Sequence, residues 1–501
     1  KKAKKHFGEW LQNKHGDIKT LNRRWGTSYD SWNAVGFPEL PLEWVRETCE
    51  KTGHTLKLDE DPAPSLIYKL FHDPLRYHAV AKYPKLLDFT RFLREVWGRK
   101  YKALKHEELW APSFTNRAQK IQPLLKKGFI YCTKSRPNPF VFREVREFSG
   151  VSYDHPACKM PPHFSQIPVD TLQIALGWPV WNSEHHLYNH GGSTPRRVRY
   201  HLLQTFLMGQ FKSTAYNRVT NHRSGRPDRA SHYNAADRDA HFRTASKTRW
   251  QIRRSEPVFR AFLNARAEAD LAVLVTEGNR GWNLMPQGPE RPELGGAIQA
   301  YGHLSALGKH WKYVLNRDVS AKHCTGALIV DAPWLLPETL RKINNLPPDR
   351  QIIVVGEIPS ANEYGSSLPE DGLADLRKRA TVIEDWSALQ NVIKPSSGLS
   401  KPFTEVGQAR FWWWGSVHGY DSYTLPVPKL DLRRVQHNGN LYVAVTNHGS
   451  KTEFTAELPW AAGKKVRELT AEKPQAFTYP PGKVCTFPPV SVRVFEITSA
   501  D

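Results

Sequence analysis

The sequence has 501 residues, of which 40% are hydrophobic and 24% are charged, proportions that are ordinary for a folded protein. No apolar run approaches the roughly 18 residues that a membrane-spanning helix needs, so we expect no such helix and no membrane partner. A chain of this length predicts roughly two to four domains.

The charge is unusual, because 71 lysines and arginines stand against 49 aspartates and glutamates, which gives a formal net charge of +22. Such an excess favours an anionic partner such as nucleic acid or a sulfated or uronic polysaccharide, although solubility alone would also account for it. The chain also has 17 tryptophans, and flat aromatic faces suit both sugar rings and unpaired bases.

The cysteines and the first residues limit what can be said about the chain's cellular setting. Five cysteines are scattered without a C-x-x-C pair, which predicts free thiols, no disulfide scaffold and no cysteine metal site. The cellular compartment therefore stays open. The chain begins with Lys1-Lys2-Ala3-Lys4-Lys5, without an initiating methionine, and we expect that sequence upstream is missing.

The first predicted region, residues 1–260, alternates helical segments with short strands. Apolar spacing predicts a helix over 7–21, broken at His15-Gly16, and further helices over 86–97 and 197–211. Repeated strand–loop–helix units predict a βα architecture. The expected strands are 113–115, 150–153, 179–182 and 213–216.

An arginine- and histidine-rich stretch over 222–255 has little apolar content. We expect a long solvated loop there. The functional alternative is a loop that flanks an active site and touches an anionic substrate, since long loops in compact domains are often functional.

The second predicted region, residues 261–398, contains short β-branched runs between helical segments. Pro337 suits the first turn of one of these helices. Continuous apolar strands that alternate with helices predict a parallel sheet covered on both faces. No G-x-G-x-x-G follows the first strand, so we infer no nucleotide site and no cofactor. The expected strands are 271–276, 311–315, 326–330, 352–355 and 381–383.

The third predicted region, residues 399–501, is expected to be a small β-sandwich. Asn438-Gly439 is a strong signal for a type I′ hairpin turn, and alternating apolar residues follow it over 441–445. The last predicted strand, 490–497, alternates in the same way.

A glutamate at the end of a predicted strand is the main catalytic candidate. In the segment 178–192, the apolar residues Pro179 to Trp181 run directly into Asn182-Ser183-Glu184 and then into polar and aromatic residues. Glycosidic bonds are usually cleaved by two carboxyl groups, and in βα-barrels these lie at the C-terminal ends of strands. Glu184 is therefore a candidate catalytic carboxylate, and a glutamate that caps the following turn is the structural alternative.

Several motifs resemble one enzyme family. Residues 7–11 (FGEWL), 15–18 (HGDI) and 21–27 (LNRRWGT) resemble the F-x-x-W-L…Y-G-x-I-x-x-L-N-x-x-W-G-T stretch of family 42 glycoside hydrolases, which belong to clan A. Residues 87–92 (LDFTRF) are similar to the L-D-Y-x-R-F of the same family, and residues 151–154 (VSYD) match its sixth strand.

This resemblance implies three domains and a set of roles. Residues 1–260 would form the second half of a (β/α)8 TIM barrel, 261–398 a flavodoxin-like domain of the trimerisation type, and 399–501 the C-terminal β-sandwich. Glu184 would be the nucleophile at the seventh strand. The expected substrate-binding residues are Asn116, Tyr153, Trp181, His185, His186, Tyr188 and Tyr216.

The sequence also departs from the family pattern. His185-His186-Leu187-Tyr188 replaces the usual glutamine- or serine-containing continuation, and Tyr216 stands where tryptophan is common. A metal site formed by His185, His186 and His190 is not expected, because no carboxylate has matching spacing. These differences leave the sugar open.

The family's acid/base glutamate precedes the LNRRWGT motif, so strands one to four and this glutamate are expected to lie outside the chain. Either the sequence is a fragment or a second polypeptide supplies the first half of the barrel. A homotrimer is a further expectation.

The predicted function is a retaining glycoside hydrolase that cleaves β-galactosides or related bonds, with an anionic polysaccharide as the alternative substrate. The rival prediction is a catalytically inactive, basic protein that binds carbohydrate or nucleic acid and retains the glycosidase fold. Binding that weakens steeply with salt, without hydrolysis, would favour the rival.

Overall fold

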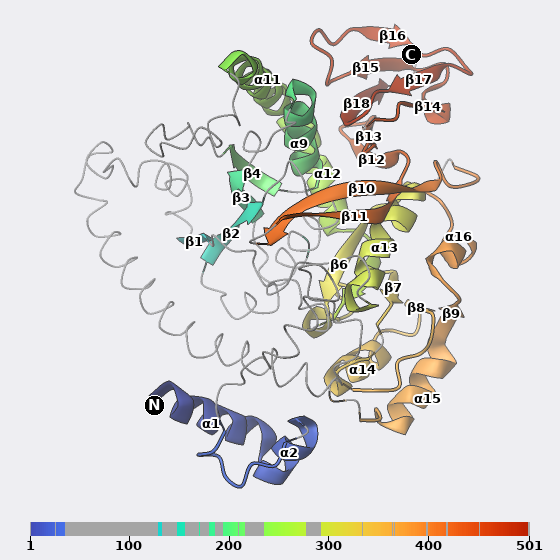
Figure 1. The fold of residues 1–501 in the computed structure, drawn as a ribbon. Helices are drawn as coiled ribbons and strands as arrows, with labels where there is room; N and C mark the ends of the chain where they lie inside the picture. Colours follow the sequence, from blue (N-terminus) through green and yellow to red (C-terminus); the bar gives the residue numbers. More distant parts are fainter. Residues whose placement is uncertain are drawn as a thin grey trace, which may run out of the picture.

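The structure is a computed structural model of the chain, and the parts it describes are drawn as ribbons in Figure 1. Some of these residues are described by their backbone alone, including the four strands between 129 and 215 and residues 411–425. The described residues are 2–25, 27–35, 129–132, 148–155, 170, 180–185, 194–208, 210–215, 235–276, 292–332, 334–362, 364, 366–396, 399–416, 419–449 and 451–498.

Two helices at the N-terminal end confirm the predicted helix and its break. Helix α1 (Lys2–His15) ends before Gly16, whose φ of 80° suits a residue without a Cβ, and α2 (Ile18–Trp25) follows. The Asp17 side chain accepts a 2.8 Å hydrogen bond from the Thr20 amide and so caps α2. The two helices bury a small core of Phe7, Leu11, Leu21, Trp25 and Val35.

The first parallel sheet consists of β1 (Phe129–Cys132), β2 (Phe148–His155), β3 (Val180–His185) and β4 (Gln210–Ala215), in that spatial order. The predicted strands at 150–153, 179–182 and 213–216 are confirmed with shifted ends. The predicted helix 86–97 and strand 113–115 lie outside the described residues.

Helix α9 (Pro195–Leu207) connects β3 to β4. Thr194 accepts a hydrogen bond from the Arg197 amide, and Pro195 occupies the first turn. The helix was predicted to reach residue 211 and ends at Leu207. Residues 210 and 211 belong to β4, where the sheet supplies their hydrogen-bonding partners.

The expectation of a solvated loop over 222–255 is wrong for the described residues. Residues 235–254 form helix α11 (Ala235–Arg254), and α12 (Glu256–Ala267) follows. The buried face of α11 carries Ala245, Thr248 and Ile252, so small and polar residues hide its amphipathic pattern.

The second parallel sheet has the order β6-β5-β7-β8-β9. Along its strands, side chains at alternate positions belong to two buried hydrophobic clusters, one on each face of the sheet. Val273 packs with Tyr301 and Leu304 of one helix on one face, and Leu274 packs with Leu340 of another on the opposite face. This confirms a parallel sheet that is covered on both faces. The elements are β5 (Leu271–Val275), α13 (Pro292–Ala306), β6 (Trp311–Leu315), η4 (Asn316–Asp318), β7 (Ala327–Val330), α14 (Pro337–Asn344), β8 (Gln351–Val355), α15 (Glu370–Arg379), β9 (Ala380–Ile383), η5 (Trp386–Ala388) and α16 (Leu389–Val392).

The C-terminal β region consists of antiparallel strands. Asn438 and Gly439, with φ values of 50° and 79°, form the predicted tight turn between β12 and β13. Side chains of a five-stranded and a two-stranded sheet share one core, which includes Val443, Phe487 and Phe495. The elements are β10 (Val406–Ser416), β11 (Gly419–Pro428), β12 (Asp431–His437), β13 (Asn440–Asn447), β14 (Phe454–Glu457), η6 (Pro459–Ala461), β15 (Lys465–Glu468), β16 (Ala476–Thr478), β17 (Val484–Phe487) and β18 (Ser491–Thr498).

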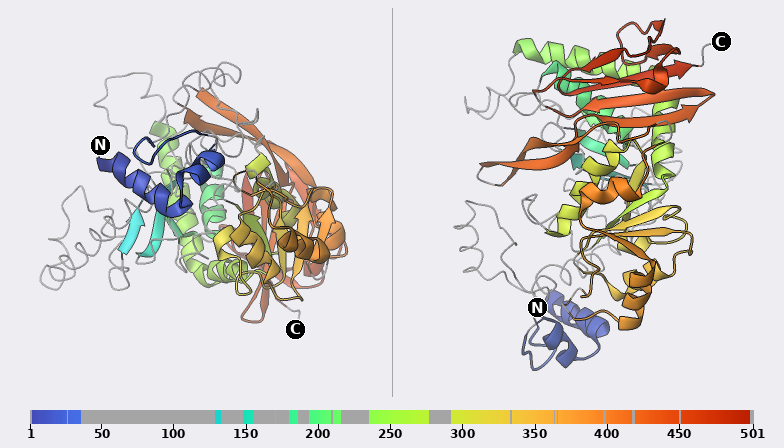
Figure 2. Two further views of the ribbon diagram at one scale, coloured as in Figure 1. Left: turned by 90° about the horizontal axis from the view of Figure 1, so that it is seen from below. Right: turned by 90° about the vertical axis from the view of Figure 1, so that its right-hand side faces the viewer.

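The long β10–β11 hairpin crosses α13, and a glycine allows the close approach. A Cβ added to Gly302 would lie 3.1 Å from the backbone of Pro426 in β11. The right-hand view of Figure 2 shows the C-terminal β region at one end of the molecule, the second parallel sheet below it, and α1 and α2 at the other end.

Cys324 and Cys485 are buried free thiols, as predicted, and the side chains of the other three cysteines lie outside the described part of the structure. No helix in the described part has the length and apolar character needed to cross a bilayer.

Candidate active site

Glu184 is the fifth residue of the six-residue strand β3. Strands β2, β3 and β4 run parallel, so their C-terminal ends lie at the same edge of the sheet. At this edge Asp154 of β2 is in register with Glu184, and His155 is in register with His185. Glu184 therefore lies near the end of a strand, as predicted. The catalytic role of Glu184 stays a prediction.

The pairing of β3 is irregular at Glu184. Tyr153 pairs with Asn182 and Asp154 pairs with Glu184, so Ser183 is an extra residue opposite β2. On the other side, the register with β4 also shifts between Asn182 and His185. Bulges of this kind are enriched at barrel rims and beside active sites, where they redirect a side chain or end the pairing.

The structure brings some of the predicted substrate-binding residues together. The backbones of Trp181 and His185 lie on β3, and that of Tyr153 lies on the neighbouring strand β2. Their side chains are outside the described part of the structure, and their binding roles stay predictions. The residues that lie wholly outside the described part are Asn116, His186, Tyr188, His190 and Tyr216.

Asp154 is a candidate to which sequence reasoning assigned no role. It follows Tyr153 near the end of β2 and is the register partner of Glu184. Adjacent strands lie about 4.8 Å apart, so two carboxyl-bearing residues are neighbours at the sheet edge. The signal was available in the sequence, because both carboxylates end predicted parallel strands.

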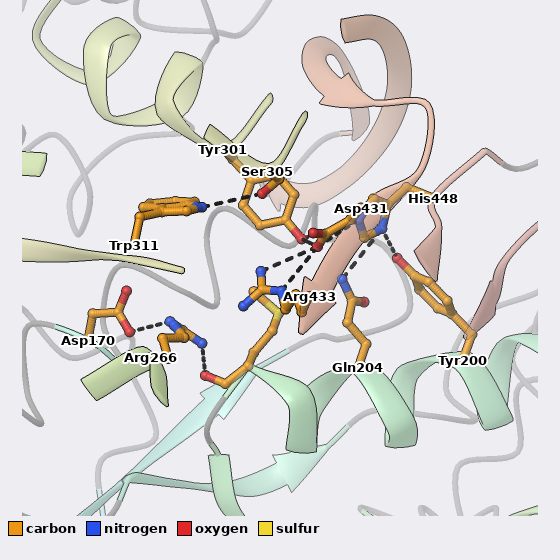
Figure 3. A network of polar contacts seen from close by, with 11 residues as sticks. Asp170, Tyr200, Gln204, Arg266, Tyr301, Ser305, Trp311, Asp431, Arg433 and His448 are labelled. Carbon is orange, nitrogen blue, oxygen red and sulfur yellow. Dashed lines mark hydrogen bonds and ion pairs between the residues drawn. The ribbon is translucent and has the colours of Figure 1, made fainter. Parts of the chain in front are cut away.

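A second cluster of functional groups lies in the interior, between α9, α13 and β12 (Figure 3). The Tyr301 hydroxyl donates a 2.8 Å hydrogen bond to Asp431 Oδ2, and Arg433 Nη2 lies 3.3 Å from the same oxygen. His448 Nε2 is 3.7 Å from Asp431 Oδ2, and His448 Nδ1 is 2.6 Å from the Tyr200 hydroxyl. We call these five residues the Asp431 network.

The charges of the Asp431 network are matched within it. Burial alone would raise the pKa of Asp431, but the Arg433 charge and the hydrogen bonds from His448 and Tyr301 hold this pKa well below its usual range. Burial, reinforced by the Asp431 charge, raises the pKa of Tyr200 and of Tyr301. Asp431 is thus an ionised carboxylate beside neutral tyrosines.

A buried ion pair lies next to this network. Arg266 of α12 contacts Asp170, and it also donates to the Met208 carbonyl at the end of α9 (Figure 3). Asp170 Oδ2 accepts a 3.2 Å hydrogen bond from the Tyr313 amide in β6. The pair therefore connects the helices of the first parallel sheet to a strand of the second.

Both interior clusters are structural. Each member of the Asp431 network and of the Arg266–Asp170 pair is at most 8% exposed, so no substrate reaches these groups. No signal in the sequence could have revealed the network, because its members come from distant segments. Among the described residues, no group of three or more His, Cys, Asp or Glu side chains could hold a metal ion.

Comparisons by sequence find nothing: no protein-family model matches the chain, and no curated protein matches it. The similarities come from solved structures. An exo-carrageenase GH42 from Bacteroides ovatus aligns with a TM-score of 0.63 and 13% identity, over 99% of this chain and 63% of that chain. The chain thus spans less than two thirds of that protein.

Two β-galactosidases give similar results. The enzyme from Bacillus circulans sp. alkalophilus aligns with a TM-score of 0.54 and 14% identity, over 99% of this chain and 76% of its own. A catalytic mutant of a GH42 β-galactosidase from G. stearothermophilus aligns with a TM-score of 0.52 and 11% identity, over 98% of this chain and 75% of its own. Identities this low establish the fold alone. The resemblance predicted from the LNRRWGT and accompanying motifs is confirmed at that level: the chain has the fold of family 42 glycoside hydrolases.

Proposed function

We propose that this chain carries the nucleophile of a retaining glycoside hydrolase that acts on β-galactosides or related linkages. The observation that carries the proposal is the position of Glu184 at the C-terminal end of β3, at a break in the strand register. Catalytic residues of βα-barrels come from such strand ends. The fold shared with β-galactosidases supports the same reading.

In the proposed reaction, the Glu184 carboxylate attacks the anomeric carbon and forms a glycosyl-enzyme. A second carboxyl group protonates the leaving oxygen and then removes a proton from the water that releases the sugar. The family resemblance puts this acid/base glutamate before the LNRRWGT motif. We therefore propose that a longer form of the chain or a second polypeptide supplies it. The reaction needs no cofactor.

An anionic polysaccharide is the substrate class that we propose. The net charge of +22 favours a polyanion, and the exo-carrageenase is the first structural neighbour described above. Carrageenans are sulfated galactans, so a galactose-specific site and a basic surface would serve the same substrate.

The test uses the complete active protein, with the intact mass of every co-purifying polypeptide measured first. We expect Glu184→Gln to lower kcat on an aryl β-galactoside by roughly a thousandfold or more, because the nucleophile is lost. A 2-fluoro galactoside with a good leaving group should label the peptide that contains Glu184, as read by mass spectrometry. Full activity of Glu184→Gln, or a label on another peptide, would contradict the proposal. Glu357→Gln, at an exposed glutamate, is the matched control.

A second candidate function is favoured by the net charge of +22: an inactive, basic protein that binds carbohydrate or nucleic acid. It predicts polyanion binding that falls steeply with salt and no hydrolysis of any glycoside by the complete protein. Turnover that depends on Glu184 would rule it out.

A further inference from the structure

Helix α11 carries an exposed row of basic side chains around one exposed tryptophan. Residues 240–254 contain five lysines and arginines and no aspartate or glutamate. Trp250 has 68% of its surface exposed, the largest fraction among the exposed large hydrophobic residues of the described structure. The helix lies on the outer side of α9, next to the C-terminal β region (Figure 1).

The helical period places the basic residues and the tryptophan on one face. Arg243, Lys247, Trp250 and Arg254 follow one another at spacings of four, three and four residues, and all are exposed. We call these four residues, together with Arg253, the α11 stripe. From a rise of about 1.5 Å per residue, the stripe is about 17 Å long. That length suits a polymer rather than a single small anion.

Trp250 holds an arginine against its ring. The Arg253 guanidinium carbon lies 5.6 Å from the ring centroid, a cation–π contact that keeps positive charge beside an apolar face. The helix dipole explains basic residues in the last turn of α11, but it does not explain a large aromatic side chain in solvent. A ligand that carries both negative charge and apolar C–H faces would use both features.

Two ion pairs of the described residues lie near the stripe. Lys247 Nζ lies 3.2 Å from the Glu472 carboxylate, which follows β15, and both side chains are exposed. Glu256, at the start of α12, is paired with Arg260. Exposed ion pairs in water are weak, so the Lys247–Glu472 pair offsets the positive charge of the stripe only slightly.

We propose that the α11 stripe is a binding surface for a sulfated polysaccharide, separate from the site at Glu184. Arginine forks bind sulfate oxygens as they bind other oxyanions, and the exposed face of Trp250 packs against the C–H face of a sugar ring. The choice of a sulfated polysaccharide rests on the proposed function. The surface would hold the polymer while its end is cleaved at the strand-end site.

Single-stranded nucleic acid is the competing polyanion. Sequence-independent binding of single strands relies on several aromatic platforms, one for each stacked base. The α11 stripe offers one platform among several cations. The glycosidase fold favours a glycan as the ligand of the α11 stripe, and the experiment below compares the binding of the two polymers directly.

The experiment measures equilibrium binding of carrageenan oligosaccharides, neutral agarose oligosaccharides and oligothymidine at several salt concentrations. All proteins carry Glu184→Gln, so that the polymer stays intact. Two changes to the stripe are compared, Trp250→Ala and the double change Arg253→Gln/Arg254→Gln. The control is Arg377→Gln/Lys378→Gln, which removes the same charge from the last turn of α15.

We expect Trp250→Ala to weaken carrageenan binding roughly tenfold with little change in its salt dependence. The arginine double change should weaken binding roughly fivefold and make the slope of log K against log salt shallower by about one to two. The α15 control should bind as the parent protein does. Neutral oligosaccharides should bind far more weakly to every variant.

Three results would overturn the inference. One is equal carrageenan binding by the stripe variants and the α15 control. Another is a loss of oligothymidine binding alone, which would make the stripe a nucleic-acid surface. The third is a change in oligomeric state without a change in polymer binding, which would make it a contact between copies. Because binding is measured without hydrolysis, loss of the proposed catalytic function would leave this result intact.

Discussion

At the scale of single residues, burial sets the behaviour of His201. This residue lies on α9 with 9% of its surface exposed. Burial, reinforced by the nearby Arg197 charge, lowers its pKa to about 3. The unfolded chain holds such a ring near its ordinary pKa of about 6.5. The unfolded state therefore takes up a proton below that pH while the folded state does not, and stability falls as the pH falls toward 3.

We expect His201→Gln to reduce the pH dependence of stability. Between pH 7 and pH 5, His201 should lower the unfolding free energy of the native protein by about 2 kcal/mol. The variant should lack this contribution. Urea unfolding at the two pH values measures the difference. His6→Gln, at an exposed histidine of α1, controls for the replacement itself. If the unfolding free energy of His201→Gln changes between the two pH values as much as that of the native protein, this account is contradicted.

The sequence could reveal Glu184 but not its neighbours in the interior. Glu184 ends a short apolar run, so a local pattern predicts its place on a strand. Tyr200 and His448 are 248 residues apart in the chain, and Tyr301 and Asp431 are 130 apart. No local pattern connects such positions, because the contact is made only when three parts of the fold pack together.

At the scale of elements, prediction succeeded where apolar residues were continuous. All five strands of the second parallel sheet were predicted within two residues of their observed ends, because each is a short run buried on both faces. Helix α11 was missed because its buried face uses Ala245 and Thr248, whereas arginines dominate its composition. Packing on α9 stabilises a helix that its hydrophobic content alone does not indicate.

The central position of β7 gives a prediction for the second sheet. Ile329 is fully buried and packs with the α13 side of the sheet. We expect Ile329→Ala to cost about 3 kcal/mol of unfolding free energy, because it removes buried methyl groups and leaves a cavity. Val382→Ala, on the edge strand β9 with 49% of the side chain exposed, should cost less than about 1 kcal/mol. Chemical denaturation of both variants tests the difference, and equal losses would argue against this assignment of the core.

At the scale of the whole molecule, polar side chains join the three parts of the chain. The Asp431 network takes Tyr200 from α9, Tyr301 from α13 and Asp431 from β12. Further contacts extend this junction: Gln251 of α11 donates to the carbonyls of Thr470 and Ala471 in the C-terminal β region. The parts are therefore held at fixed angles by directional bonds as well as by apolar packing.

We expect Asp431→Asn to cost about 3–5 kcal/mol, because Arg433 would keep a buried charge without its carboxylate. Hydrogen exchange should speed up in α9, α13 and β12 together, since all three contribute to the network. Glu405→Gln removes an exposed partner of Lys429 and should leave stability nearly unchanged, because solvent screens such a pair. Faster exchange confined to β12 would show that the network does not join the three parts.

The extra residue in β3 has a consequence for how this strand can vary. An extra residue in one strand shifts the register of every residue after it against the neighbouring strand, and Ser183 is that extra residue opposite β2. Loss of one residue there would restore regular pairing and move Glu184 into the position of its neighbour. A deletion in β3 would therefore displace the proposed nucleophile from the strand end, whereas a substitution at another position of the strand would leave Glu184 in its register.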